Sequence, residues 1–222
     1  MVPPSPLSWI SEMEDYPAPW FVAIGASGGK GLSDIQAILS LLPRALKAIV
    51  LIVLHRPWDH LSHLQEVLAR ASLMPVRTAA NGTLLEMGNA YIGAPGDHLT
   101  LAAGGFGVLV SDPFRKHRNR TIDLLFRSVA AHGGNRMIGV VLSGALDDGA
   151  RGLTALHEAG GLSMVLTPTE PPDCGMPENA INYDGPIDRI GNPSDIALAI
   201  CEAVSGKDRK SNRRSARECR CP

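Results

Sequence analysis

Short apolar runs that alternate with helical periodicity are the feature of this 222-residue sequence that most constrains its fold. The strongest run, residues 48–54 (AIVLIVL), holds seven apolar residues without a break, whereas a membrane helix needs about 20. We expect a buried strand there, because a short continuous apolar run is typical of a strand that is covered on both faces. Further strands are expected at residues 21–25, 137–142 and 162–166, and short strands with a hairpin within 88–111.

Apolar residues at helical spacing fill most of the intervals between these runs. The expected helices are residues 33–42, 60–71, 121–131, 149–159 and 194–204. Ser194 is the expected N-cap of the last one. Strands and helices that alternate in this way predict a doubly wound, mainly parallel sheet with helices on both faces, a Rossmann-like α/β fold.

The two ends differ in composition from the centre. Residues 1–18 are rich in proline and acidic side chains, which predicts a disordered leader. Residues 206–222 carry seven basic and two acidic side chains, a charge of +5, which leaves −6 on the rest because the whole chain carries −1. This tail is either a solvated, disordered end or a contact for an acidic partner. One folded domain is therefore expected at residues 19–205.

Composition argues against several classes of protein. A net charge of −1 does not favour nucleic-acid binding, and no stretch resembles a signal peptide or a membrane span. We therefore expect a cytoplasmic protein without membrane insertion. Disulfides are rare inside cells, so the cysteine thiols should be unpaired. The cysteines do not have the spacing of zinc ligands, and no metal or cofactor is predicted. The cysteines are Cys174, Cys201, Cys219 and Cys221.

The first of three loops with reactive side chains follows the strand predicted at residues 21–25. Its sequence, GASGG (25–29), matches the G-x-S-x-G turn of a nucleophile elbow, with Ser27 at the centre. The next helix would direct free N–H groups and its positive end to the same place, which suits a developing oxyanion. The alternative is that Ser27 only caps that helix.

Two nucleotide-binding patterns overlap this loop but lack their other parts. Gly25, Gly29 and Gly31 match the glycine spacing of short-chain dehydrogenases, but none of the three tyrosines has a lysine four residues later. A phosphate-binding P-loop needs Ser or Thr after Gly-Lys, and here Gly31 follows Lys30. We therefore favour a serine nucleophile over a nucleotide site.

The other two loops supply a base and an acid. His55 directly follows the strongest strand, and residues 143–149 (SGALDDG) place Asp147 and Asp148 after the strand predicted at 137–142. Because the carboxyl ends of parallel strands share one edge of the sheet, Ser, His and Asp are expected to meet there as a triad. The alternative role for one aspartate is to cap the helix that starts near Gly149.

Six motifs, in this order, resemble the catalytic domain of the chemotaxis protein-glutamate methylesterases, the CheB family. They are AIGASGG (23–29), LHRP (54–57), YIGAPGDHL (91–99), TIDLLFRSVA (121–130), VVLSGALDDGARGL (140–153) and GMPENAI (175–181). The resemblance implies a cytoplasmic enzyme that hydrolyses γ-methyl esters of glutamate on the cytoplasmic helices of methylated chemoreceptors, often with glutamine deamidation. It implies no cofactor.

Roles follow from motif position in this resemblance. Ser27 would be the nucleophile, His55 the general base and Asp148 the acid, because the family's aspartate directly precedes the glycine of the SG…DG motif. Asp147 is then an extra carboxylate. Residues 19–205 would be the methylesterase catalytic domain.

The resemblance also predicts an oxyanion hole, and the loops at the carboxyl edge of a doubly wound sheet predict a substrate rim. Backbone N–H groups of Gly28 and Ala145 would hold the oxyanion, and Ala145 stands where the family has methionine. Leu54 replaces a glutamine beside the catalytic pair. The expected rim residues, where basic groups would attract acidic receptor helices, are Arg56, Lys30 and Met176.

In the family an attached receiver domain covers the site until it is phosphorylated. Residues 1–18 are too few for a domain, so we expect activity without phosphorylation and any control by a separate regulator. Two other functions stay open. One is a different small esterase or amidase with the same triad, and the other is a non-catalytic interaction module that retains the fold.

Overall fold

The computed structural model describes residues 18–55, 62–114, 116–117, 120–168, 175–183 and 185–206. Nearly all of the expected leader and tail lie outside these residues, as do Arg56, Cys174, Cys219 and Cys221. Within the described chain, no helix has the length and apolarity to cross a bilayer.

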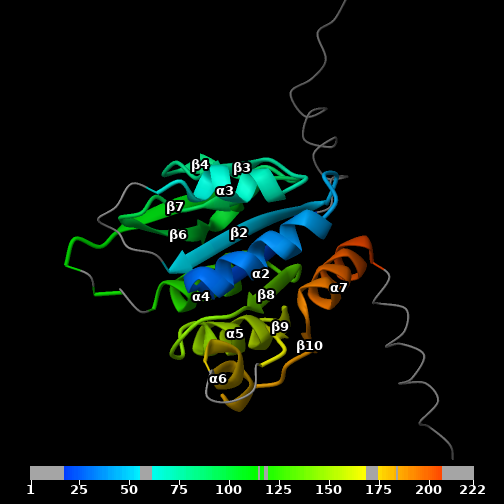
Figure 1. Ribbon diagram of the computed structural model, residues 1–222. Helices are drawn as coiled ribbons and strands as arrows, with labels where there is room; N and C mark the ends of the chain where they lie inside the picture. The colour runs from blue at the N-terminus through cyan, green and yellow to red at the C-terminus, as the bar shows by residue number, and fades with distance from the viewer. Residues whose placement is uncertain are drawn as a thin grey trace, which may run out of the picture.

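A parallel sheet of seven strands in the order β10-β9-β8-β1-β2-β5-β3 forms the centre of the described chain (Figure 1). Every neighbouring pair in it is parallel. The strands are β1 (Trp20–Ser27), β2 (Ala48–His55), β3 (Val76–Thr78), β5 (Ala90–Ile92), β8 (Met137–Val141), β9 (Leu162–Leu166) and β10 (Arg189–Gly191). The chain winds from β1 toward β2 on one side and later returns to β8 on the other, so β1 is the topological switch point.

Helices cover both faces of this sheet, which confirms the doubly wound prediction. The first face carries α2 (Gly28–Leu41), α3 (Leu64–Ala71) and α7 (Pro193–Ser205), and α2 and α7 lie in front in Figure 1. The second face carries α4 (Thr121–His132), α5 (Ala150–Glu158) and α6 (Met176–Asn182). Alternate residues of β1 serve the two cores: Val22 and Ile24 pack on the first face, Phe21 and Ala23 on the second.

The predicted hairpin within residues 88–111 is also present. β6 (Asp97–Ala102) and β7 (Phe106–Ser111) pair antiparallel across the 3₁₀ turn η1 (Ala103–Gly105), and β4 (Thr83–Leu84) joins them in a three-stranded sheet. Gly104 at φ 77° and Gly105 at φ 83° make this turn possible, because side-chain-bearing residues rarely adopt left-handed backbone. β6 contributes Leu99 and Leu101 to the core of the α4 face.

Three predicted helix starts were wrong. The helix expected from residue 60 begins at Leu64, and residues 62 and 63 before it are not helical. The helix after Ser27 starts at Gly28 rather than residue 33, since its first turn is glycine-rich and shows no apolar periodicity. The last helix is capped by Asn192, not Ser194. The Asn192 side chain accepts the N–H groups of Ser194 and Asp195, and Pro193 fits the first helical position because it needs no hydrogen-bond acceptor there.

Candidate active site

Strand register places Ser27 and His55 side by side. They are direct partners at the carboxyl ends of β1 and β2, where neighbouring strands lie about 4.8 Å apart. Every second side chain of a strand points to the same face of the sheet. Ser27 therefore shares the face of Phe21 and Ala23, which pack against α4. His55 likewise shares the face of Ile49 and Leu51, which pack there too. Both candidate side chains therefore belong to the α4 face of the sheet.

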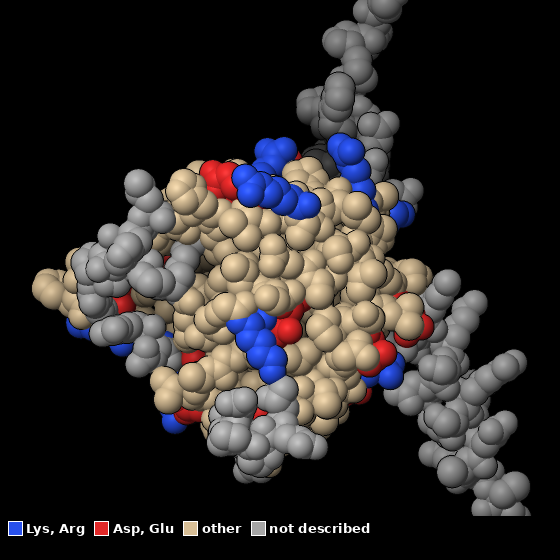
Figure 2. Space-filling model, viewed as in Figure 1, with Lys and Arg blue, Asp and Glu red and all other residues tan. Residues whose placement is uncertain are grey.

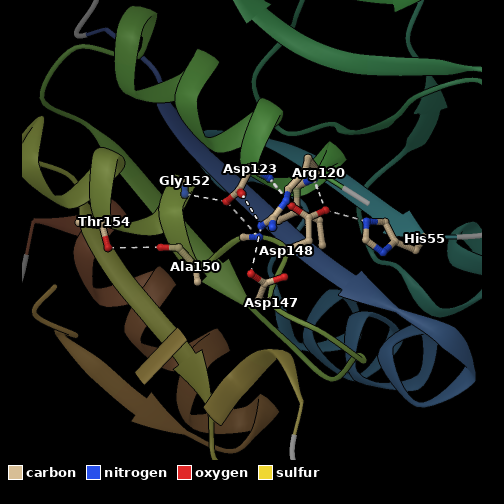
Figure 3. A network of polar contacts seen from close by, with 10 residues as sticks. His55, Arg120, Asp123, Asp147, Asp148, Ala150, Gly152 and Thr154 are labelled. Carbon is tan, nitrogen blue, oxygen red and sulfur yellow. Dashed lines mark hydrogen bonds and ion pairs between the residues drawn. The ribbon is translucent and has the colours of Figure 1, made fainter. Parts of the chain in front are cut away.

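His55 reaches the third predicted member of the triad. Its Nε2 lies 2.7 Å from Oδ2 of Asp148, as Figure 3 shows. The Asp148 side chain is 1% exposed, and its carboxylate also accepts the backbone N–H of Ile122 at 2.9 Å and of Asp123 at 2.9 Å. These N–H groups lie in the first turn of α4 and have no acceptor within the helix. Asp148 thus binds His55 and caps α4 at the same time.

Asp123 performs the reciprocal task for α5. Its Oδ1 accepts the N–H of Gly149 at 3.1 Å and of Gly152 at 2.7 Å, while its own N–H binds Asp148. The prediction that Asp147 or Asp148 caps the helix near Gly149 was wrong, because the acceptor comes from α4 instead. Burial raises the pKa of Asp123, and the charge of Asp148 adds to this rise, against the lowering effect of the N–H donors and Arg120.

Sequence reasoning missed Asp123. In the sequence it is an acidic residue in the first turn of the helix predicted at TIDLLFRSVA (121–130). Carboxylates are common in the first turn of a helix, where they are usually solvated. In the structure Asp123 is only 5% exposed, so its carboxylate oxygens accept hydrogen bonds from the protein rather than from water. Only the packing of α4 against α5 reveals this use.

Asp147 belongs to a second, more exposed contact. Its Oδ2 lies 3.2 Å from Nη1 of Arg120, whose guanidinium is also 3.5 Å from Asp123. Partial burial lowers the pKa of Arg120, but the carboxylates of Asp147, Asp123 and Asp148 outweigh this effect and raise it. Arg120 therefore stays cationic and balances the carboxylates around the loop after β8.

The loop around Ser27 leaves the serine side chain available. Ser27 occupies the N-cap position of α2 but makes no capping hydrogen bond, so the interpretation of this residue as only a cap was wrong. Gly28 follows with φ 70°, a conformation that glycine adopts without strain. The N–H groups of the first turn of α2 have no acceptor within the helix and lie next to the Ser27 side chain.

A second backbone donor is oriented by α6. The carbonyl of Gly144 accepts the N–H of Met176 at 2.8 Å, and a trans peptide directs its C=O and N–H to opposite sides. The N–H of Ala145, in the same peptide unit, is therefore turned away from the start of α6. Gly144 also packs closely against Ser27, since an added Cβ would lie 2.8 Å from the Ser27 Cβ.

Comparison with known proteins identifies the family of this chain. Residues 22–200 match the family model described as CheB methylesterase. The chain belongs to the CheB methylesterase family. A relative from Salmonella typhi, described as a protein-glutamate methylesterase/protein-glutamine glutaminase, is 37% identical over 189 residues, covering 83% of this chain and 53% of that protein. One of the same description from Yersinia pestis is 39% identical over 173 residues, 76% of this chain and 49% of that protein.

This CheB-family chain spans about half the length of the curated relatives it matches. It also resembles the crystal structure of the Thermotoga maritima CheB methylesterase catalytic domain, with a TM-score of 0.74 and 26% identity. That match covers 84% of this chain and 99% of the Thermotoga chain. The six motifs thus indicated the correct family.

The three predicted rim residues differ in where the structure places them. Met176 is fully buried, so its prediction as a rim residue was wrong; its sulfur packs beneath Gly144, where only a glycine leaves room for it. Lys30 is exposed in the first turn of α2, and Arg56 lies outside the described residues. Figure 2 shows the face that α2 and α7 cover, where scattered basic and acidic side chains lie among uncharged ones.

No group of three or more His, Cys, Asp or Glu side chains in the described parts of the chain is arranged to hold a metal ion. Cys201 is unpaired, as expected. Burial and the neighbouring charge of Glu202 raise the pKa of this thiol. It lies on α7, which covers the first face of the sheet, whereas Ser27 and His55 belong to the second.

Proposed function

We propose that residues 19–205 are the catalytic domain of a protein-glutamate methylesterase that also deamidates glutamine. The substrates would be methylated cytoplasmic helices of chemoreceptors, and the chain would act in the cytoplasm. The observation that carries this proposal is the 2.7 Å contact between His55 and buried Asp148, formed beside Ser27 at the end of the adjacent strand. The printed names of the Salmonella and Yersinia relatives support the reaction class.

The proposed chemistry begins with the hydrogen bond of His55. A carboxylate accepts but does not donate, so Nε2 carries the hydrogen and Nδ1 keeps its lone pair. Nδ1 takes the Ser27 proton as Oγ attacks the ester carbonyl carbon. Ser27 and His55 are partners in strand register, and the hydrogen bond between a nucleophile and its base commonly tightens only when substrate binds.

The oxyanion and the leaving group complete the cycle. The N–H groups of Gly28 and Ala145 would hold the tetrahedral oxyanion. The protonated His55 gives its proton to the departing methoxide, which leaves as methanol, and a glutamine side chain would release ammonia in the same way. A water molecule, deprotonated by His55, then attacks the acyl-enzyme and restores free Ser27 with a glutamate product.

The direct test is Ser27→Ala with Ser33→Ala as a matched control, because Ser33 is an exposed serine on α2, the helix that directly follows Ser27. On a methylated receptor fragment, Ser27→Ala should lower the rate of methanol release by at least about 10³-fold, and Ser33→Ala should not. Wild-type turnover by Ser27→Ala would refute the serine mechanism. Turnover of p-nitrophenyl esters without receptor demethylation would identify a different small esterase, and no turnover of either would indicate an interaction module.

A further inference from the structure

Leu146 has a backbone conformation that leucine normally avoids. Its φ is 68°, the one positive φ among the described non-glycine residues. In this left-handed region the Cβ approaches the following carbonyl oxygen, which glycine avoids because it has no Cβ. If the loop only required this turn, glycine would provide it at lower cost. The presence of a leucine side chain therefore needs a separate reason.

Contacts on both sides hold the loop around Leu146 in place. The side-chain amide of Asn179, on α6, donates to the Leu146 carbonyl at 2.7 Å, and the N–H of Met176 holds the carbonyl of Gly144. On the other side Asp147 pairs with Arg120 at 3.2 Å. Leu146 thus cannot adopt a relaxed conformation without breaking contacts from α6 or displacing the segment that leads to Asp148.

Burial within the chain does not explain the leucine either. Its side chain remains 63% exposed, so most of its apolar surface gains nothing from the fold. Its position is nonetheless central to the site: two residues before it, Gly144 packs against Ser27, and two residues after it, Asp148 binds His55. Leu146 therefore lies along the chain between a residue that packs against the candidate nucleophile and the residue that binds the candidate base.

We propose that Leu146 is a specificity-determining residue that packs against an apolar side chain of the peptide carrying the ester. The inference rests on the proposed function. Leucine has no donor or acceptor, so its contribution to binding is the removal of apolar surface from water. A small ester that reaches only Ser27 would not need this contact, whereas a peptide that extends past the nucleophile would.

The kinetic signature of such a contact is a change in KM alone. An apolar contact remote from the reacting atoms is equally strong in the bound substrate and in the transition state. Its loss therefore raises KM and leaves kcat unchanged. Covering the exposed part of one leucine corresponds to about a fivefold to tenfold change in KM.

The experiment compares three variants on a methylated receptor fragment and on p-nitrophenyl acetate. Leu146→Asn removes the apolar surface but tolerates left-handed backbone, and Leu146→Met keeps an apolar side chain. Leu198→Gln is the matched control, because Leu198 is similarly exposed, at 60%, on α7. We expect Leu146→Asn to raise KM for the fragment about fivefold to tenfold with kcat and p-nitrophenyl acetate hydrolysis unchanged, and the other two variants to match wild type.

The possible results separate this inference from the proposed function. If wild type demethylates the fragment and Leu146→Asn has the same KM, the role of Leu146 is refuted and the methylesterase assignment stands. If Leu146→Asn lowers kcat on both substrates, Leu146 acts through the catalytic loop and the inference also fails. If wild type leaves the fragment methylated, the proposed function fails, and this inference with it.

Discussion

The exchange of caps between α4 and α5 makes Asp123 the most informative residue to change. In Asp123→Ala the N–H groups of Gly149 and Gly152 lose their acceptor in the interior. A buried donor without a partner costs about 1–3 kcal/mol. The variant also removes a buried carboxylate that lies near Asp148, which offsets part of this loss. We expect a net destabilisation of about 2–3 kcal/mol.

Thermal unfolding and turnover together test this reasoning. For a chain of this length, 1 kcal/mol shifts Tm by about 2–4 °C, so Asp123→Ala should melt about 5–10 °C below wild type. Asp148 directly precedes Gly149, so loss of the cap should also loosen the carboxylate that holds His55. We expect kcat to fall about tenfold at a temperature where the variant is fully folded, since small displacements of catalytic groups are costly.

Asp123→Asn is the matched control. Its amide oxygen can accept both N–H groups, and it loses only the 3.5 Å contact with partly exposed Arg120, which contributes less than about 1 kcal/mol. A Tm for Asp123→Ala within about 1 °C of wild type would refute the energetic value of the exchanged caps. A lower Tm with unchanged kcat would show that the caps stabilise the helices without positioning Asp148.

Two further predictions concern carboxylates. Asp148→Asn should lower kcat about 10³- to 10⁴-fold in a methanol-release assay, because it removes the carboxylate that holds His55. Asp147→Asn loses only an exposed ion pair and should change kcat less than about threefold. The opposite ranking of the two variants would reject Asp148 as the acid. Burial raises the pKa of Asp112, but hydrogen bonds from the N–H groups of His117 and Lys116 and from His98 outweigh it and bring the pKa to about 2, below the ordinary 3.8. The stabilising contribution of ionised Asp112 is therefore complete above pH 3.8 and is lost as the pH falls through about 2. In Asp112→Asn, Tm should therefore depend less steeply on pH between 4 and 2 than in wild type. The same slope in both proteins would contradict the low pKa.

The sequence by itself determined the elements and the loops that carry the chemistry. The apolar run at residues 48–54 favoured a buried strand, and the glycines around Ser27 favoured a tight turn before a helix, because both signals are local. Since parallel strands end at one edge, the sequence also predicted that Ser27, His55 and one of two aspartates would meet. The family motifs added which aspartate, and the contact with His55 is indeed made by Asp148.

Tertiary structure decided what depends on contacts between distant segments. Nothing near Asp123 in the sequence indicates that it caps a helix 26 residues away, because that role exists only when α4 and α5 pack with their starts together. Met176 was predicted at the rim because loops at the carboxyl edge of the sheet surround the site, but packing of α6 beneath Gly144 buries it. The left-handed backbone of Leu146 likewise depends on contacts of its loop with α6 and with Arg120, which precedes α4, since local preference in a leucine opposes it.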